Sequence, residues 1–130
     1  MLFRSEASSI LELALTTQWD SRLLRAYRQG TAPVGSATLL KQIEYCERWL
    51  NERPNDTEIS LALGVLCLKQ KLWGKAQRHL EQSLTGSDLV TRQEAHLRLA
   101  QLHEELNQPE AAADHYRQCA MTLLPIAAKS

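Results

Sequence analysis

The four histidines are the residues of this chain best suited to binding a haem or a metal ion. His96 and His103 lie seven residues apart, about two helical turns, and so share one helix face. His79 and His115 lie 36 residues apart, at equivalent positions of an internal repeat. No HxxxH or HExxH spacing, which a zinc site on one helix needs, occurs in the chain. The pattern favours structural or solvated histidines, and it predicts no metal site and no bound cofactor.

The three cysteines, Cys46, Cys67 and Cys119, are expected to pack between helices as small apolar residues. Their odd number and the absence of a CxxC motif indicate a reducing compartment rather than a disulfide framework. No cysteine is followed by proline, and no nucleophile and base occur in a recognisable arrangement. The sequence therefore predicts a protein that is not an enzyme.

An internal repeat is the strongest structural signal in the sequence. Ile59 to Leu84 aligns without a gap on Ala95 to Ala120, at an offset of 36 residues. The six identical pairs are Leu61/Leu97, Leu63/Leu99, Leu66/Leu102, Ala76/Ala112, His79/His115 and Gln82/Gln118. A period of this length predicts stacked helix–turn–helix units that contact only their neighbours, and a surface for binding rather than for chemistry.

The whole chain is expected to be helical, in one domain. Helices are predicted over residues 9–17, 21–29, 36–51, 56–69, 72–84, 91–106 and 109–124. Ser9 with Glu12 and Thr91 with Glu94 have the spacing of capping boxes. The last helix is expected to end before Pro125, because proline disfavours helix in the residue preceding it.

The two repeat units resemble the tetratricopeptide pattern, which alternates bulky and small residues at fixed positions. The matching positions are Leu63, Gly64, Ala76 and Leu80 in one unit, and Leu99, Ala100, Ala112 and Tyr116 in the next. Trp73 fits the aromatic position of the second helix, whereas Ser60 and His96 stand where the pattern has tryptophan. The resemblance implies an all-α, right-handed superhelical solenoid. Its parts are an orphan half repeat (9–17), a degenerate repeat (20–53) and two good repeats (56–86 and 90–124).

Composition excludes several classes of function. Fifteen basic and fifteen acidic side chains give a net charge of zero, so nothing suggests nucleic-acid binding. No apolar run approaches the 18 residues of a membrane span, and the start MLFRSEASS lacks the apolar core of a signal peptide.

Four segments make the chain similar to the C-terminal region of the HemY family. These are Gln18 to Asp20, Trp49 to Pro54, the LWGKA of residues 72–76 and the EAAADHYRQC of residues 110–119. The family consists of proteobacterial inner-membrane proteins with tetratricopeptide repeats, linked to late porphyrin and haem synthesis. The resemblance implies a scaffold for haem-biosynthesis enzymes that faces the cytoplasm and is held at the inner membrane by a region absent from this chain. A flavin-dependent oxidase is excluded, because the five glycines never form a dinucleotide-binding fingerprint.

Carrying the tetratricopeptide pattern over predicts a partner-binding groove on the first helices of the repeats. Its residues are Arg22, Arg25, Arg28, Glu58, Leu61, Val65, Leu68, Lys69, Glu94, Leu97, Gln101, Glu104 and Glu105. Such a groove grades from basic through apolar to acidic, and a protein or peptide is the expected occupant. Leu61 and Val65 replace the Lys and Asn of carboxylate-clamp members, which disfavours chaperone-tail binding. The alternative hypothesis is a haem or porphyrin carrier that uses His79 or His115.

The first predicted helix is expected to mediate weak self-association. Ile10, Leu11 and Leu15, with Leu2 and Phe3 upstream, form more apolar surface than one neighbouring helix can cover. One side is expected to pack on the second helix, and the other to meet a missing repeat or a copy of itself.

Overall fold

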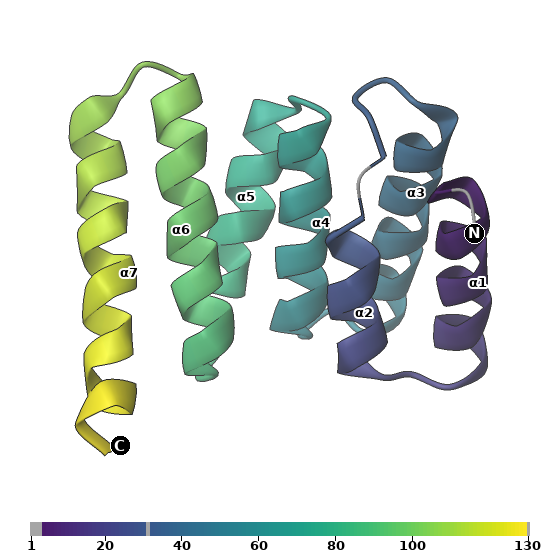
Figure 1. The fold of residues 1–130 in the computed structure, drawn as a ribbon, viewed down its shortest axis with the longest axis horizontal. Helices are drawn as coiled ribbons and strands as arrows, with labels where there is room; N and C mark the ends of the chain where they lie inside the picture. The colour runs from purple at the N-terminus through teal and green to yellow at the C-terminus, as the bar shows by residue number, and fades with distance from the viewer. Residues whose placement is uncertain (1–3, 31, 130) are drawn as a thin grey trace.

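The computed structural model describes the backbone of residues 4–30 and 32–129 and the side chains of residues 6–30 and 32–122. Within these ranges the protein has seven α-helices and no β-strand, which confirms the all-α class (Figure 1). The helices are α1 (Arg4–Thr17), α2 (Ser21–Arg28), α3 (Ala37–Glu52), α4 (Thr57–Lys69), α5 (Trp73–Ser83), α6 (Leu89–Glu105) and α7 (Pro109–Lys129). Leu2 and Phe3 lie outside the described residues.

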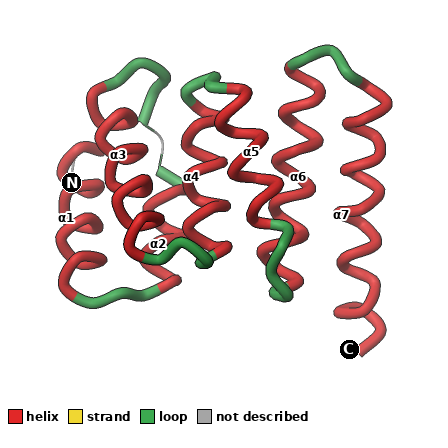
Figure 2. Tube along the Cα trace, turned by 180° about the vertical axis from the view of Figure 1, so that it is seen from behind, coloured by secondary structure: helices red, strands yellow, loops and turns green. Residues whose placement is uncertain are grey.

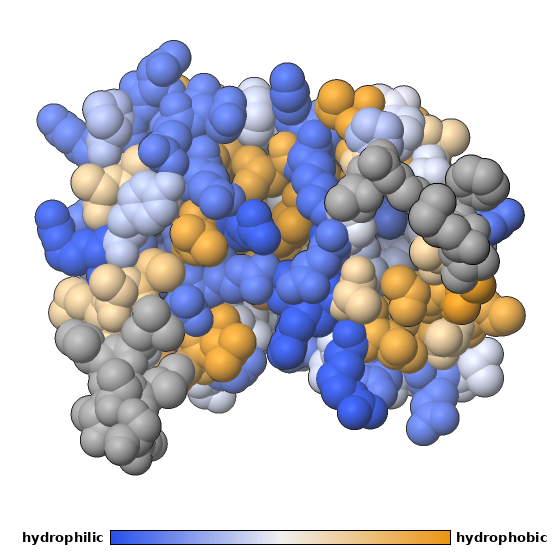
Figure 3. All heavy atoms as spheres, viewed as in Figure 1, coloured by the Kyte–Doolittle hydropathy of each residue, from blue (hydrophilic) through white to orange (hydrophobic). Residues whose placement is uncertain are grey.

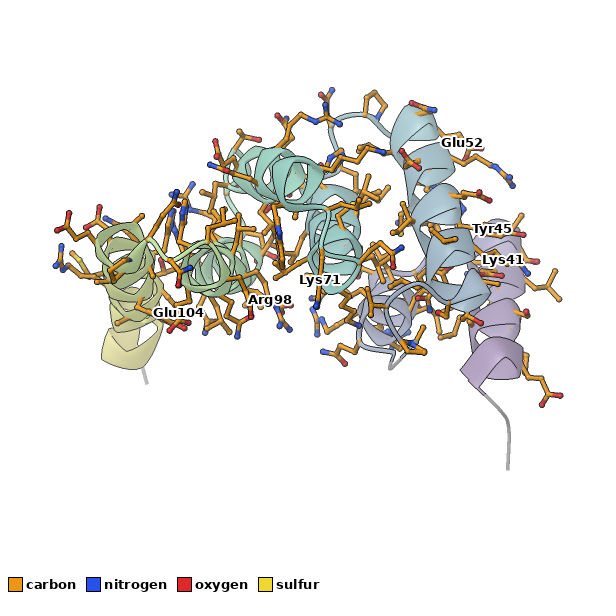
Figure 4. All side chains as sticks on the ribbon, turned by 90° about the horizontal axis from the view of Figure 1, so that it is seen from above. Lys41, Tyr45, Glu52, Lys71, Arg98 and Glu104 are labelled. Carbon is orange, nitrogen blue, oxygen red and sulfur yellow. The ribbon has the colours of Figure 1, made fainter. Side chains whose placement is uncertain are left out.

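The helices stand side by side in two layers (Figure 1 and Figure 4). Helices α2, α4 and α6 form the layer nearer the viewer in Figure 1, which we call the front face. Helices α3 and α5 form the other layer, seen from behind in Figure 2. Helix α1 closes one end of the row against α2 and α3, and α7 closes the other end against α6. Helix α4 contacts α2, α3, α5 and α6, so it is the central helix of the molecule.

The two repeat units end their first helices in the same way. Lys71 and Asn107, 36 residues apart, both adopt left-handed backbone conformations, with φ of 63° and 58°. In each turn the N–H of the next residue donates to a carbonyl five residues back, from Leu72 to Cys67 (2.9 Å) and from Gln108 to His103 (2.8 Å). These bonds satisfy carbonyl groups that a helix C-terminus leaves free. The sequence repeat is therefore also a repeat of local structure.

Small residues lie where the helices of each unit pack. A Cβ atom added to Gly64 would come within 2.7 Å of Cγ and Cδ2 of Leu80 on α5. Ala76 on α5, Ala100 on α6 and Ala112 on α7 are all buried. The close approach of α4 and α5 thus depends on the missing side chain at Gly64.

A buried carboxylate joins the three N-terminal helices. Glu12 on α1 accepts hydrogen bonds from Ser8 (3.1 Å) and from the hydroxyl of Tyr27 on α2 (2.6 Å), and it pairs with Lys41 on α3 (3.3 Å). The predicted capping box of Ser9 and Glu12 is wrong, because α1 starts at Arg4 and both residues lie inside it. Glu12 has the spacing of a cap but serves as an acceptor between helices.

Aromatic rings complete the N-terminal core. Trp49 on α3 contacts Trp19, Tyr27 and Tyr45, with ring centroids 5.4–5.6 Å apart. Trp19 lies in the link between α1 and α2, so the ring cluster joins α1, α2 and α3. The described backbones of α2 and α3 do not approach each other closely, and the aromatic side chains bridge them. Edge-to-face contacts of this kind add to the stabilisation from burial alone.

Two other predicted helix ends differ from the structure. Helix α6 is capped by Asp88, which accepts from the N–H and the hydroxyl of Thr91, so the capping box predicted at Thr91 and Glu94 is wrong. Aspartate is a strong N-cap, and here it outcompetes the threonine three residues later. Helix α7 continues through Pro125 to Lys129 rather than ending before it. A proline removes only one main-chain donor, and the residues on either side remain helical here.

Candidate functional site

The apolar centre predicted for the groove is not exposed. Leu61 and Val65 are only 1% and 2% exposed, and Leu68 and Leu97 are half-buried. Because α4 is packed on four sides by α2, α3, α5 and α6, little of it remains for a partner. The front face shows polar side chains with separate apolar patches between them rather than one apolar stripe (Figure 3).

Several charged side chains predicted to line the groove bind other groups of the protein instead. Arg28 on α2 forms a two-fold ion pair with Glu94 on α6, at 2.5 and 3.1 Å. Glu94 also lies 3.7 Å from Arg98. The ammonium group of Lys69 donates to the carbonyl groups of Arg28 (2.7 Å) and Gly30 (2.5 Å), and burial lowers its pKa. These side chains fasten α2, α4 and α6 together, so they are not free to bind a partner.

The basic end of the predicted groove is a narrow crevice at the N-terminal ends of the front helices. It is lined by Ser21, Leu24, Arg25, Arg28, Glu58, Leu61, Val90 and Thr91. Its volume of about 10 Å³ suits one water molecule and no side chain. Burial, followed by the charges of Asp56 and Asp88, raises the pKa of Glu58. Arg22 lies outside the crevice, exposed and paired with Asp20 at 3.0 Å.

A larger opening lies at the C-terminal ends of α4 and α6, and we call it the α4–α6 cleft. It has a volume of about 470 Å³ and is lined by Leu68, Lys69, Lys71, Trp73, Gln101, Glu104 and Glu105. Five of these residues were predicted for the groove. In Figure 4, Lys71, Arg98 and Glu104 lie along the part of the molecule formed by α4, α6 and α7.

Lys71 and Trp73 are the cleft residues that sequence reasoning missed. Both follow the end of α4, where the left-handed turn at Lys71 brings the chain back beside α6. The pattern identified Trp73 as an aromatic at the start of a packed helix, and the structure leaves it half-buried. The signal that could have found the site is the turn itself, because loops at helix ends carry binding residues more often than helix centres do.

The side chains of the cleft differ in what they offer a ligand. Trp73 and Leu68 provide apolar surface, and Glu104 and Glu105 are exposed carboxylates. Glu104 accepts a hydrogen bond from the hydroxyl of Tyr116 on α7. Since the ammonium group of Lys69 is held by main-chain carbonyls, Lys71 is the one cleft cation among the described residues that has no such bond.

Three histidines, His96, His103 and His115, form a cluster between α6 and α7. The sequence paired His96 with His103 and His79 with His115, so the cluster matches neither pair alone. The Nδ1 atoms of His96 and His115 lie 3.1 Å apart, so one ring donates to the other. The ring of His103 stacks on that of His115 at 5.3 Å, with 5° between the planes. His79 on α5 has no ring contact with His115 among the described side chains. Burial lowers the pKa of His79, His96 and His115.

The thiols are poorly placed for nucleophilic chemistry. Cys46 and Cys67 are buried, and burial raises the pKa of Cys67 to about 11 and that of Cys46 further. A buried thiol held protonated is a weak nucleophile and a weak metal ligand. In the part of the chain that the structure describes, no three His, Cys, Asp or Glu residues are arranged to hold a metal ion.

No described helix combines the length and the apolar character needed to cross a membrane. Comparison of the chain with family models, with curated proteins and with solved structures gives no match.

Proposed function

We propose that this protein is a tetratricopeptide-type scaffold that binds a segment of a protein partner in the α4–α6 cleft. The observation that carries the proposal is the cleft itself, which joins an indole and a leucine to two exposed carboxylates. The repeated helix–turn–helix units, with equivalent turns at Lys71 and Asn107, support the tetratricopeptide assignment.

The chemistry of the cleft specifies the partner segment. Because main-chain carbonyls hold Lys69, Glu104 and Glu105 outnumber the remaining cation, Lys71, and favour a lysine or arginine side chain. The indole of Trp73 offers that side chain a cation–π contact. Leu68 adds apolar surface for a neighbouring residue of the partner. We therefore infer a peptide that carries a basic residue beside an apolar one.

Selection from a displayed library of random peptides tests this inference. The protein should enrich peptides with adjacent basic and apolar residues, and Glu104→Lys with Glu105→Lys should weaken their binding at least tenfold. Glu44→Lys with Glu81→Lys changes the charge equally at exposed positions on the back layer, and it should bind as the wild type does. Enrichment of acidic peptides, or equal binding by both double variants, would remove the cleft as the site.

The resemblance to HemY proteins suggests the biological setting of such a partner. On that basis we propose that the partner belongs to late porphyrin or haem synthesis and that a region outside this chain holds the scaffold at the inner membrane. Co-purification of haem-biosynthesis enzymes with the membrane-anchored protein, lost in the Glu104→Lys and Glu105→Lys variant, is the expected result.

The carrier hypothesis has one observation in its favour, which is the cluster of His96, His103 and His115. A haem carrier would use the free ring nitrogens of this cluster. Titration with haemin should then give a saturable Soret shift that His115→Ala abolishes and His79→Ala leaves intact, because His79 lies apart from the cluster. A shift absent from the wild-type protein would exclude the carrier.

A further inference from the structure

A second opening, far from the α4–α6 cleft, lies at the other end of the molecule between α1 and α3. It has a volume of about 230 Å³ and is lined by Leu15, Thr16, Thr17, Trp19, Arg48, Trp49, Glu52 and Arg53. Figure 4 shows Tyr45 and Glu52 along the side of α3 that faces away from α4. We call this opening the α1–α3 pocket.

Two arginines of the pocket are oriented by aromatic rings. The guanidinium group of Arg53 lies 4.7 Å from the ring centroid of Trp19, and that of Arg48 lies 4.9 Å from the ring centroid of Tyr45. Neither guanidinium forms an ion pair with a carboxylate in the described part of the chain. Stacking on an aromatic face leaves the N–H edge of a guanidinium free to bind an oxyanion in a bidentate manner.

The charge of the pocket specifies the charge of the ligand. Arg48 and Arg53 contribute two positive charges and Glu52 one negative charge, so the lining carries one net positive charge. A carboxylate monoanion balances this charge, whereas a phosphate dianion would leave the site with a net negative charge. The hydroxyl groups of Thr16 and Thr17 donate to main-chain carbonyls of α1, which leaves the arginines as the principal donors.

The walls specify the rest of the ligand. The half-buried Trp19 offers apolar surface in the pocket, and the nearly fully buried Leu15 and Trp49 lie behind it. A volume of about 230 Å³ limits the ligand to a small molecule or to one terminal residue of a chain. A branched aliphatic carboxylate, or the terminal residue of a chain ending in leucine, has this size.

We propose that the α1–α3 pocket binds a carboxylate joined to a small apolar body, held by Arg48 and Arg53 against Trp19. The carboxylate belongs either to a free aliphatic acid or to the last residue of a partner chain. This pocket shares no residue with the α4–α6 cleft, so either site can fail its test without affecting the other.

Tryptophan fluorescence gives a direct test. In a Trp73→Phe background the emission comes only from Trp19 and Trp49, both of which line the pocket. Titration with 4-methylpentanoate represents the free acid, and titration with N-acetyl-leucine represents a chain terminus. N-acetyl-leucinamide lacks the carboxylate, and inorganic phosphate carries the wrong charge. Saturable binding of either acid supports the proposal and identifies the source, and the amide should not bind.

Variants distinguish specific binding in the pocket from a general attraction of anions to positively charged surface. Arg53→Gln and Arg48→Gln should each weaken acid binding at least tenfold, and Glu52→Gln should strengthen it several-fold. Arg78→Gln removes an exposed arginine on α5 and should leave binding unchanged. Because all these side chains are exposed, circular dichroism should show that the variants remain folded. No saturable binding, equal binding of the amide, stronger binding of phosphate, or acid binding unaffected by both Arg48→Gln and Arg53→Gln would overturn the proposal.

Discussion

At the scale of single residues, Gly64 and Gly74 show how opposite roles can be given to the same residue type. They lie ten residues apart, Gly64 in α4 and Gly74 in α5, on either side of the turn that joins these helices. A Cβ at Gly64 would meet Leu80, whereas a Cβ at Gly74 would meet nothing within 4 Å. Packing therefore requires glycine only at the first position.

Alanine at the two glycines should change stability in opposite directions. Gly64→Ala should lower the free energy of unfolding by about 1–3 kcal/mol, because the added methyl group forces Leu80 and α5 to move. Gly74→Ala should raise it by about 0.5–1 kcal/mol, because alanine loses less backbone entropy in a helix. Urea unfolding followed by circular dichroism measures both. If Gly64→Ala were as stable as the wild type, the α4–α5 packing described above would be incorrect.

The histidines should make the protein less stable in mild acid. The pKa of His79, His96 and His115 lies below the ordinary value of 6.5, chiefly because of burial. The unfolded chain therefore binds protons near pH 6.5 while the folded protein stays neutral at these sites. Their contribution to stability is complete above pH 6.5 and is lost as the pH falls through the lower folded values.

Thermal unfolding at pH 7.5 and pH 5.5 measures this loss. The Tm should be lower at pH 5.5, and the difference should be smaller in His115→Gln, which removes the centre of the cluster. Burial raises the pKa of Glu58, so this residue stabilises the folded protein as the pH falls. That opposing effect lies closer to pH 4.5, the ordinary pKa of a glutamate. A Tm that is higher at pH 5.5 than at pH 7.5 would contradict the burial of the histidines.

At the scale of elements, the turns after α4 and α6 differ in how well their residues suit a left-handed backbone. Lys71 and Asn107 occupy equivalent positions with positive φ. Asparagine tolerates this conformation better than lysine, and glycine tolerates it best.

Glycine should therefore stabilise one turn more than the other. Lys71→Gly should raise the free energy of unfolding by about 0.5–1 kcal/mol, since it removes the steric cost of a Cβ in this region. Asn107→Gly should gain less. Chemical denaturation of the two variants provides the comparison, and a loss of stability in Lys71→Gly would show that its side chain contributes more than its backbone costs.

The elements themselves were largely predictable, because helical periodicity and helix caps are local signals. Asp20, Ser36 and Asp56 cap the helices that follow them, and all three are of residue types that commonly cap helices. The capping-box predictions failed where a residue that could cap its own helix instead binds residues far away in the sequence. Glu12 appeared to be part of a cap, but Tyr27 and Lys41, which bind it, lie on other helices.

The candidate site was less predictable for the same reason. The pattern placed Leu61, Arg28 and Lys69 on one surface, but sequence spacing alone does not reveal that neighbouring helices bury the first and bind the other two. The α1–α3 pocket depends on Arg53 meeting Trp19, which lies 34 residues earlier on another segment. Contacts of this range follow from tertiary packing, which a single sequence does not specify.

At the scale of the whole molecule, α1 presents a different apolar surface from the one expected. Leu15 is buried and Leu11 packs against the core, whereas Ile10 and Leu13 are 53% and 70% exposed. Glutamate at Leu11 and Leu15, two of the residues expected to mediate self-association, would therefore damage the core rather than the outer surface. The exposed pair suits self-association of α1 between two molecules.

Sedimentation equilibrium tests this self-association. The apparent mass should rise with concentration in the wild type and stay monomeric in Ile10→Glu with Leu13→Glu. The variant Ser9→Glu with Thr17→Glu adds the same charge at exposed polar positions of α1 and should associate as the wild type does. A wild-type protein that remains monomeric at all concentrations would mean that Ile10 and Leu13 are simply solvated.

The claim that the α4–α6 cleft is the partner-binding site is tested most directly by mapping a bound peptide on the folded protein. Nuclear magnetic resonance spectra recorded during titration with a library-selected peptide report which backbone amides change environment. We expect the largest shifts at residues 68–73 and 101–105, the two segments that contain the cleft residues. Shifts confined to α3 and α5 on the back layer, with residues 68–73 and 101–105 unchanged, would contradict this account.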